Sequence, residues 1–194
     1  MKINKPITEN SYAIYGLGLS GKSALKFLKK KKAKKIYTWD DKKKSKTRKY
    51  LGTFRKLLNE VDYIVISPGI NIKKTKLKSS LIKNQKKIIT DLDLFYMQKL
   101  AVKSIMVTGT NGKSTTCKLI QHILRTDKID AQVGGNIGKP ILDLKIKKKS
   151  IVVIEASSFQ LSHLKFAKPT LATILNITKD HLDWHGTIKN YQNS

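Results

Sequence analysis

Short apolar runs alternate with stretches of helical spacing along this sequence, and most runs end in a glycine-containing or polar turn. The pattern predicts strands at 11–15, 35–39, 61–66, 87–90, 104–107, 151–154 and 170–175. Helices are expected between them, for example from the spacing of Ala24, Leu25, Phe27 and Leu28. Strands that alternate with helices predict an α/β fold with largely parallel sheets. A new strand–loop–helix unit begins at Ser104, so we place a domain boundary between positions 92 and 93.

The segment Thr108–Thr116, with the sequence Thr-Gly-Thr-Asn-Gly-Lys-Ser-Thr-Thr, connects a predicted strand to a predicted helix. A glycine-containing loop at this place turns backbone N–H groups inward, and the positive end of the following helix attracts phosphate. Lys113 would place a cation on the outer phosphates, and the hydroxyl of Ser114 or Thr115 would bind magnesium. The helix is expected to bury one face made of Cys117, Leu119, Ile120, Ile123 and Leu124.

The earlier segment Gly16–Ser23 competes for the nucleotide. It satisfies both the dinucleotide-binding pattern G-x-G-x-x-G and the P-loop pattern G-x-x-x-x-G-K-S. The later loop has Val107 where the P-loop pattern has its first glycine, so an ordinary Asn-Gly turn is the alternative there. A magnesium–nucleotide site needs a carboxylate at the end of a neighbouring strand, and the run 151–154 ends at Glu155. The run 61–66 ends without an acid, so we assign ATP to the later loop and another phosphate-bearing ligand to the earlier one.

Four further segments place polar groups or close backbone at strand ends. Asp40 and Asp41 stand near the place of a ribose-binding acid, and Ser67–Ile70 is either a ligand-binding or a simple turn. Two adjacent glycines before Asn136 bring the backbone close to a neighbour and offer an amide there. The segment 176–186 is a candidate magnesium or substrate site, because it contains Asp180, His181, Asp183 and His185.

The composition is that of a globular, strongly basic protein with 40% hydrophobic residues and a formal net charge of +27. Lysine supplies almost all of the positive charge, because only Arg48, Arg55 and Arg125 are arginine. Proteins that read nucleic acids favour arginine and aromatic stacking, so we expect solvated lysines and no specific nucleic-acid partner. The sequence shows no leader segment and no run of membrane-spanning length, and it has a single cysteine. We therefore expect a cytoplasmic protein without a membrane partner.

Together, these segments resemble the Mur ligase family of ATP-dependent ligases, and the resemblance covers nearly the whole chain. The loop Thr108–Thr116 is similar to that of all Mur ligases and of folylpolyglutamate synthase. The Gly16–Gly21 loop and the segment Val133–Gly138 resemble the D-glutamate-adding branch of the family. Further matching segments are Ser67–Ile70, Asp91–Phe95, Ser157–Leu161 and Asn176–Gly186.

The resemblance implies an enzyme of three domains that acts in peptidoglycan precursor synthesis. A Rossmann-like domain at 1–92 would bind the UDP part of the substrate, and a P-loop central domain at 93–194, here incomplete, would bind ATP and Mg²⁺. The amino-acid-binding domain would be absent. ATP would phosphorylate the terminal carboxylate of UDP-N-acetylmuramoyl-L-alanine, and the amine of D-glutamate would attack the acyl phosphate. The products would be an amide, ADP and phosphate, and we expect a monomer.

The resemblance also implies roles for individual residues. ATP would bind at Gly109, Thr110, Asn111, Gly112, Lys113, Ser114 and Thr115. Metal would bind at Ser114, Glu155 and His181, and catalysis would rest on Lys113, Glu155 and His181. The substrate would bind at Leu19, Ser20, Ser67, Pro68, Gly69, Asn136, Ser157 and Gln160, and more loosely at Asp41 and Lys42.

Three features depart from the family pattern. Trp184 stands where the family often has arginine, Lys179 where it often has an acid, and the family's carbamylated lysine would fall past Ser194. We therefore expect that this chain alone does not complete the ligation. The alternatives are another Mur ligase or a folylpolyglutamate synthase relative, a basic P-loop module that binds nucleic acid, and a nonfunctional remnant.

Overall fold

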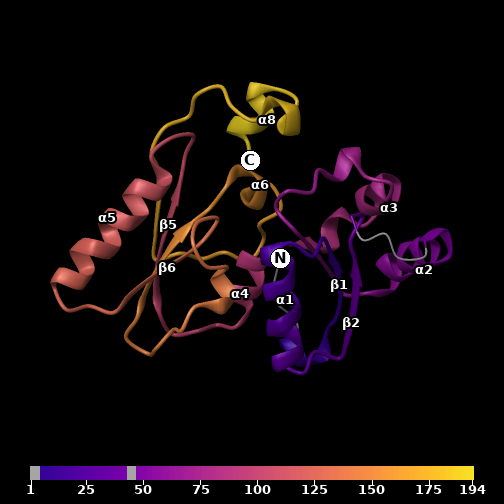
Figure 1. The fold of residues 1–194 in the computed structure, drawn as a ribbon, viewed down its shortest axis with the longest axis horizontal. Helices are drawn as coiled ribbons and strands as arrows, with labels where there is room; N and C mark the ends of the chain where they lie inside the picture. Colours follow the sequence, from indigo (N-terminus) through magenta and orange to yellow (C-terminus); the bar gives the residue numbers. More distant parts are fainter. Residues whose placement is uncertain (1–4, 43–46) are drawn as a thin grey trace.

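The computed structural model describes residues 5–42 and 47–194, and its strands form two four-stranded parallel sheets that lie side by side (Figure 1). The strand order is β2-β1-β3-β4 in the first sheet and β6-β7-β5-β8 in the second. Every strand pair in both sheets is parallel, which confirms the predicted α/β class. Among the described residues, no helix combines the length and the apolar character needed to cross a membrane.

The first sheet is organised around β1, whose residues from Tyr12 to Tyr15 are all buried. A strand covered on both faces reads as a continuous apolar run, as the sequence does here. The strands of this sheet are β1 (Ser11–Tyr15), β2 (Lys35–Trp39), β3 (Tyr63–Ile66) and β4 (Ile88–Ile89). The helices of this unit are α1 (Leu19–Lys30), α2 (Thr47–Glu60) and α3 (Lys78–Lys83), with short 3-10 turns η1 (Ile7–Glu9), η2 (Ile72–Lys74) and η3 (Gln85–Lys87).

The second sheet has β5 and β7 at its centre, and their register sets Val107 beside Glu155. Its edge strand β8 leaves Leu171 and Ile174 exposed. The strands are β5 (Lys103–Thr108), β6 (Ala131–Gly135), β7 (Ile151–Glu155) and β8 (Leu171–Ile174). The helices are α5 (Lys113–Thr126), α6 (Ser158–Leu161), α7 (Leu182–His185) and α8 (Ile188–Gln192), with a 3-10 turn η4 (Ile141–Asp143).

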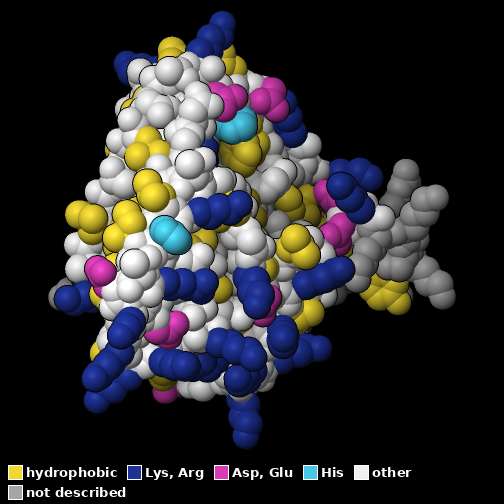
Figure 2. Space-filling model, turned by 60° about the vertical axis from the view of Figure 1, so that its left-hand side comes forward, with side chains coloured by type: hydrophobic (Ala, Val, Ile, Leu, Met, Phe, Trp, Pro, Cys, Tyr) yellow, Lys and Arg dark blue, Asp and Glu magenta, His cyan; other side chains and the backbone are white. Residues whose placement is uncertain are grey.

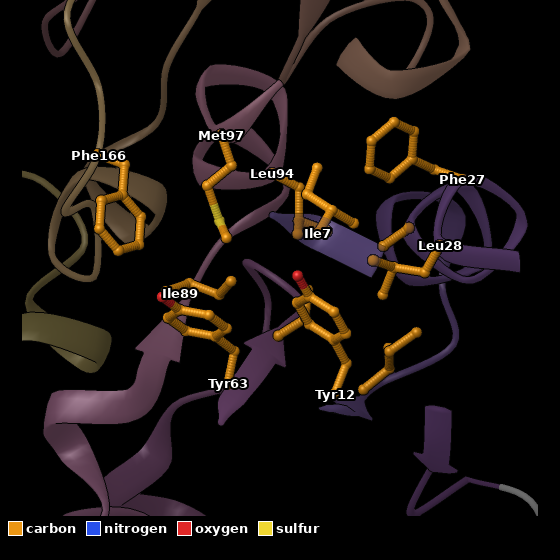
Figure 3. Packing of buried hydrophobic residues seen from close by; sticks show 12 residues of the cluster. Ile7, Tyr12, Phe27, Leu28, Tyr63, Ile89, Leu94, Met97 and Phe166 are labelled. Atoms are coloured by element: carbon orange, nitrogen blue, oxygen red, sulfur yellow. The ribbon is translucent and has the colours of Figure 1, made fainter. Parts of the chain in front are cut away.

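Helix α4 (Asp91–Met97) contributes to the cores of both units. Its Leu94 and Met97 point toward Tyr12 and Tyr63 of the first sheet, with Phe166 of the second unit beside them (Figure 3). The other face of α4 carries Leu92 and Phe95, which pack with Met106, Val152 and Ile154 of the second sheet. The boundary that we placed at 92/93 therefore lies inside a helix that both units bury, and it stays a proposal.

The apolar face predicted for α5 is only partly right. Cys117 is fully buried, and Ile120 and Leu124 pack against the sheet, whereas Leu119 and Ile123 are 55% and 52% exposed. Successive residues turn by about 100° around a helix, so positions 117, 120 and 124 form one stripe and positions 119 and 123 lie on the other side. The predicted strands 61–66 and 87–90 are also shorter in the structure, as β3 begins at Tyr63 and β4 contains two residues.

The lysine side chains are distributed broadly on the face that Figure 2 shows. They are densest in its lower part, and acidic side chains lie between them (Figure 2). Such a mixed distribution is typical of a solvated surface.

Candidate functional site

The loop after β5 ends in a helix start that suits an anion. Gly112 has φ of +84° and is followed directly by the first residue of α5, Lys113. Gly109 has φ of +137°, and a Cβ atom there would come within 3.0 Å of the Asn176 carbonyl oxygen. The Lys113 Nζ atom donates to the carbonyl oxygens of Gly109 at 2.7 Å and Thr110 at 2.8 Å. The loop thus holds its own cation beside the free amides of the helix N-terminus.

The residues that follow β8 fix this loop from the side. The Asn176 carbonyl accepts from the Thr110 N–H at 2.9 Å, and its side chain bonds both backbone groups of Asn111. The Thr110 hydroxyl is turned inward, where it accepts from the Thr178 N–H at 2.9 Å and meets the Tyr191 hydroxyl. Among the loop residues predicted to bind ATP, Thr110 therefore has its N–H and its hydroxyl bonded within the protein. Asn111 has its N–H and its carbonyl bonded in the same way. Asn176 lies in the candidate segment 176–186, but no individual role was predicted for it from the sequence.

The acid predicted to face this loop does so. Glu155 is the last residue of β7 and is 2% exposed. Its Oε2 atom accepts from the Ser114 hydroxyl at 2.7 Å, and its Oε1 atom accepts from the Asn136 Nδ2 atom at 2.8 Å. The backbone reaches this position through Gly135, where a Cβ atom would lie 2.4 Å from the Glu155 carbonyl oxygen. The close approach predicted from the paired glycines is thus to the end of β7.

A cleft of about 910 Å³ opens at the carboxyl ends of β1 and β3. The strand order reverses between these two strands, and open parallel sheets bind ligands at such a point. Most of the predicted substrate residues line this cleft, namely Leu19, Ser20, Ser67, Pro68, Gly69, Asn136 and Gln160, as do Asp41 and Lys42. Ser157 is not among its lining residues, because its hydroxyl caps α6 by accepting from the Gln160 N–H.

The first glycine loop is built differently from the second. Helix α1 already begins at Leu19, so Gly21, Lys22 and Ser23 lie inside the helix. A Cβ atom on Gly21 would come within 1.9 Å of the Gly16 carbonyl oxygen, which makes this turn tight. The Leu17 N–H donates to the Asp40 Oδ2 atom at 2.6 Å, so a carboxylate of the protein occupies that amide.

The segment after β8 brings only some of its four polar residues together. His181 has φ of +51° and is the N-cap of α7. Its side chain is 41% exposed, and its Nε2 atom lies 3.4 Å from the Asp180 Oδ2 atom. His185 turns inward, where its Nε2 atom lies 2.9 Å from the Ser158 hydroxyl and burial lowers its pKa. Among the described residues, no group of three or more His, Cys, Asp or Glu side chains could hold a metal ion. The two histidines and two aspartates therefore do not form a metal cluster, and the role of this segment as a magnesium or substrate site stays a prediction, with His181 as the candidate ligand.

Asp91 contacts Gln160, which lines the cleft, and it was not predicted as a site residue. It stands at the N-terminus of α4, is 1% exposed, and accepts through Oδ1 from the Gln160 Nε2 atom at 3.1 Å. Burial raises its pKa, and hydrogen bonds from Gln160 and Ser20 oppose that rise. The sequence placed Asp91 in the first turn of a helix, where acids are common for electrostatic reasons, and so gave no sign of this contact.

Comparison with known families matches both units. The model for "Mur ligase MurD-like, N-terminal domain" matches residues 10–90, and that for "Mur ligase middle domain" matches residues 107–194. The chain belongs to the Mur ligase family.

The curated relatives point to one branch of that family, the UDP-N-acetylmuramoylalanine–D-glutamate ligases. That of Wolbachia pipientis wMel is 37% identical over 98% of this chain and 39% of its own length. That of Aquifex aeolicus is 38% identical over 94% of this chain and 42% of its own length. That of Rickettsia bellii is 46% identical over 68% of this chain and 29% of its own length. The chain thus spans about two fifths of the length of the first two relatives, at 39% and 42%.

One solved structure shares the fold. It is the UDP-N-acetylmuramate:L-alanyl-gamma-D-glutamyl-meso-diaminopimelate ligase from Neisseria meningitides, with a TM-score of 0.53 and 18% identity. The likeness covers 95% of this chain and 66% of that one.

Proposed function

We propose that this chain is the nucleotide- and UDP-substrate-binding part of an ADP-forming ligase that adds D-glutamate to UDP-N-acetylmuramoyl-L-alanine. The observation that carries the proposal is a continuous set of contacts from one ligand site to the other. Asn136 lines the cleft and donates to Glu155, and Glu155 accepts from Ser114 at the start of α5. A substrate in the cleft and a nucleotide on the loop would meet at this carboxylate.

The geometry supports transfer of a phosphoryl group. In the proposed reaction a carboxylate oxygen of the substrate attacks the γ-phosphorus of ATP, the bond to the β–γ bridging oxygen breaks, and ADP leaves. Lys113 and the amides at the start of α5 would stabilise the charge that spreads over the transferred group. Asn136, at the cleft end of the contacts, would orient the attacking carboxylate. Attack by the D-glutamate amine on the acyl phosphate would then release phosphate and form the amide.

The residues present suit a magnesium ion. Glu155 and Ser114 offer a carboxylate and a hydroxyl, and oxygen donors are the ligands that Mg²⁺ prefers. Such an ion would neutralise charge on the phosphates. His181 would serve a second ion, as the family resemblance implies. The family resemblance implies that D-glutamate binds a third, amino-acid-binding domain, and this chain spans 39% and 42% of the length of the first two relatives.

Matched lysine variants test the assignment of the two loops. Lys113→Met should weaken MgATP binding to this chain about 100-fold and leave the affinity for UDP-N-acetylmuramoyl-L-alanine within twofold, since a desolvated phosphate contact is lost. Lys22 lines the cleft. Lys22→Met should weaken binding of the UDP substrate several-fold and leave the affinity for MgATP unchanged. Both affinities can be measured by isothermal titration calorimetry. Loss of MgATP binding in Lys22→Met, or no binding of either ligand to the parent chain, would contradict the proposal.

The same assays separate the sister enzymes. A relative that adds the first amino acid would prefer UDP-N-acetylmuramate over its L-alanyl form, whereas the proposed function predicts the reverse order of affinities. We expect no ADP release that depends on D-glutamate from this chain alone. The absence of a specific nucleic-acid partner stays a prediction.

A further inference from the structure

Two side chains of the first unit reach across to the segment that contains His181. Asn71 follows the turn after β3, and Lys74 ends η2. The Asn71 Nδ2 atom donates to the Trp184 carbonyl at 3.0 Å, and the Lys74 Nζ atom donates to the Asp183 carbonyl at 2.6 Å. The partners are 113 and 109 positions apart in the chain.

The acceptors are the last carbonyls of a one-turn helix. Helix α7 begins with the His181 carbonyl, which accepts from the N–H groups of Trp184 and His185, each at 3.0 Å. The final carbonyls of a helix have no partner within it, and a cation near them is favourable. Here Asp183 and Trp184 are satisfied from the first unit, and the His185 carbonyl accepts from the Asn190 Nδ2 atom at 2.9 Å within its own unit.

The Asn71 side chain is fixed at both ends. Its Oδ1 atom accepts from the Lys73 N–H at 2.9 Å and so caps η2, which leaves the Nδ2 atom aimed at Trp184. The His181 side chain, in contrast, is 41% exposed and stands on a left-handed backbone, which is strained for a residue other than glycine. Its ring contacts Asp180 at 3.4 Å and lies 4.7 Å from the Phe159 ring, and the turn that follows fixes the backbone from which the ring projects.

We propose that Asn71 and Lys74 are positioning residues that fasten α7 to the UDP-binding unit and thereby set the direction of the His181 imidazole. Both residues also line the cleft. The position of His181, which is proposed to lie beside the nucleotide, is thus coupled to the unit that is proposed to bind the UDP substrate. The link between α7 and a metal ion rests on the proposed function, whereas the fastening itself does not.

Amide hydrogen exchange in this chain tests the fastening directly. Asn71→Asp keeps the oxygen that caps η2 and replaces the donor by an oxygen that repels the Trp184 carbonyl. Lys74→Met removes the other donor and keeps the aliphatic stem. Each should speed exchange of the Trp184, His185 and Gly186 amides about tenfold, the effect of one lost hydrogen bond. Lys74→Arg should restore protection, and Lys78→Met, at an exposed lysine of α3, should have no effect.

Exchange within twofold of the parent in both Asn71→Asp and Lys74→Met would overturn the proposal, as would equal acceleration by Lys78→Met. The β7 amides report in the same spectra whether each variant is folded. If Asn71→Asp does not fold, Lys74→Met and Lys74→Arg decide, because Lys74 is exposed.

A second measurement separates this proposal from the function. Mn²⁺ added with a non-hydrolysable ATP analogue should broaden the His181 ring signals in the parent chain and less so in Lys74→Met. Amide exchange could be faster in Lys74→Met while Mn²⁺ does not broaden the His181 ring signals of the parent chain. That result would support the fastening and overturn the metal role of His181.

Discussion

The two glycine loops contain the same Gly-Lys-Ser triplet, and they differ in where it stands relative to the helix. In the second loop the triplet 112–114 forms the N-cap and the first two positions of α5. In the first loop α1 begins at Leu19, so the triplet 21–23 occupies its third to fifth positions. As a result the Ser114 hydroxyl meets Glu155, whereas the Ser23 hydroxyl is buried and, among the described residues, has no hydrogen-bond partner. The same triplet thus stands at the proposed phosphate-binding position in the second loop and inside the helix in the first.

The acids beside the loops differ in the same way. Glu155 accepts from the Ser114 hydroxyl at the N-terminus of the helix that follows the second loop. Beside the first loop, Asp40 accepts from the Leu17 N–H, and buried Asp91 accepts from Gln160. Glu155 likewise accepts from Ser114 and Asn136, so the loops differ in which loop group the acid binds: an amide in the first loop and a hydroxyl at the helix start in the second. We therefore expect the second loop to be the one that receives a triphosphate.

The largest expected effect is on the free energy of unfolding, when one glycine of each loop is replaced by alanine. Gly21→Ala would set a Cβ atom 1.9 Å from the Gly16 carbonyl oxygen, so we expect a loss of about 3 kcal/mol or more in the free energy of unfolding. Gly112→Ala meets only Leu175, at 3.5 Å, and should cost about 1–2 kcal/mol through its φ of +84°. Urea denaturation measures both. A larger loss for Gly112→Ala would contradict the idea that the first loop is the tighter one.

An intermediate effect concerns Asp91 and the pH. Because burial raises its pKa above the unfolded-state value, the folded chain holds this proton more tightly than the unfolded chain. Its contribution to stability is full below the unfolded-state pKa and is lost as the pH rises through the folded-state pKa. Asp91→Asn keeps the Oδ1 acceptor without a charge. At a pH above the folded-state pKa of Asp91, the free energy of unfolding of this variant should be about 1 kcal/mol higher than that of the parent chain.

The gain from Asp91→Asn should vanish below about pH 4, near the ordinary pKa of aspartate. Asp93→Asn is the matched control in the same helix. Asp93 accepts from the Thr90, Lys165 and Phe166 N–H groups, so Asp93→Asn should destabilise the fold. Denaturation midpoints measured from about pH 3 to about pH 8 test both predictions. A gain for Asp91→Asn that does not change with pH would show that the carboxylate charge is not the cause.

Much of the site could be predicted because it depends on local order. A strand, a glycine turn and a helix start follow one another between 103 and 113, and the end of a parallel neighbour strand must lie beside them. That reasoning found both Glu155 and the glycine approach at Gly135. The contacts of Asn71 and Lys74 with residues 109 and 113 positions away could not be found in this way. Nor could the inward turn of His185, which depends on Ser158 of another helix.

The smallest expected effect tests the helices that follow the two loops. α1 buries Ala24, Phe27 and Leu28, whereas α5 buries only Cys117 fully and lies at the surface. Leu119→Gln on the exposed side of α5 should therefore change the free energy of unfolding by less than about 0.5 kcal/mol. Leu124→Gln, on the stripe that packs against the sheet, should cost about 1–2 kcal/mol. Equal losses at the two positions, measured in urea, would mean that something covers the outer side of α5.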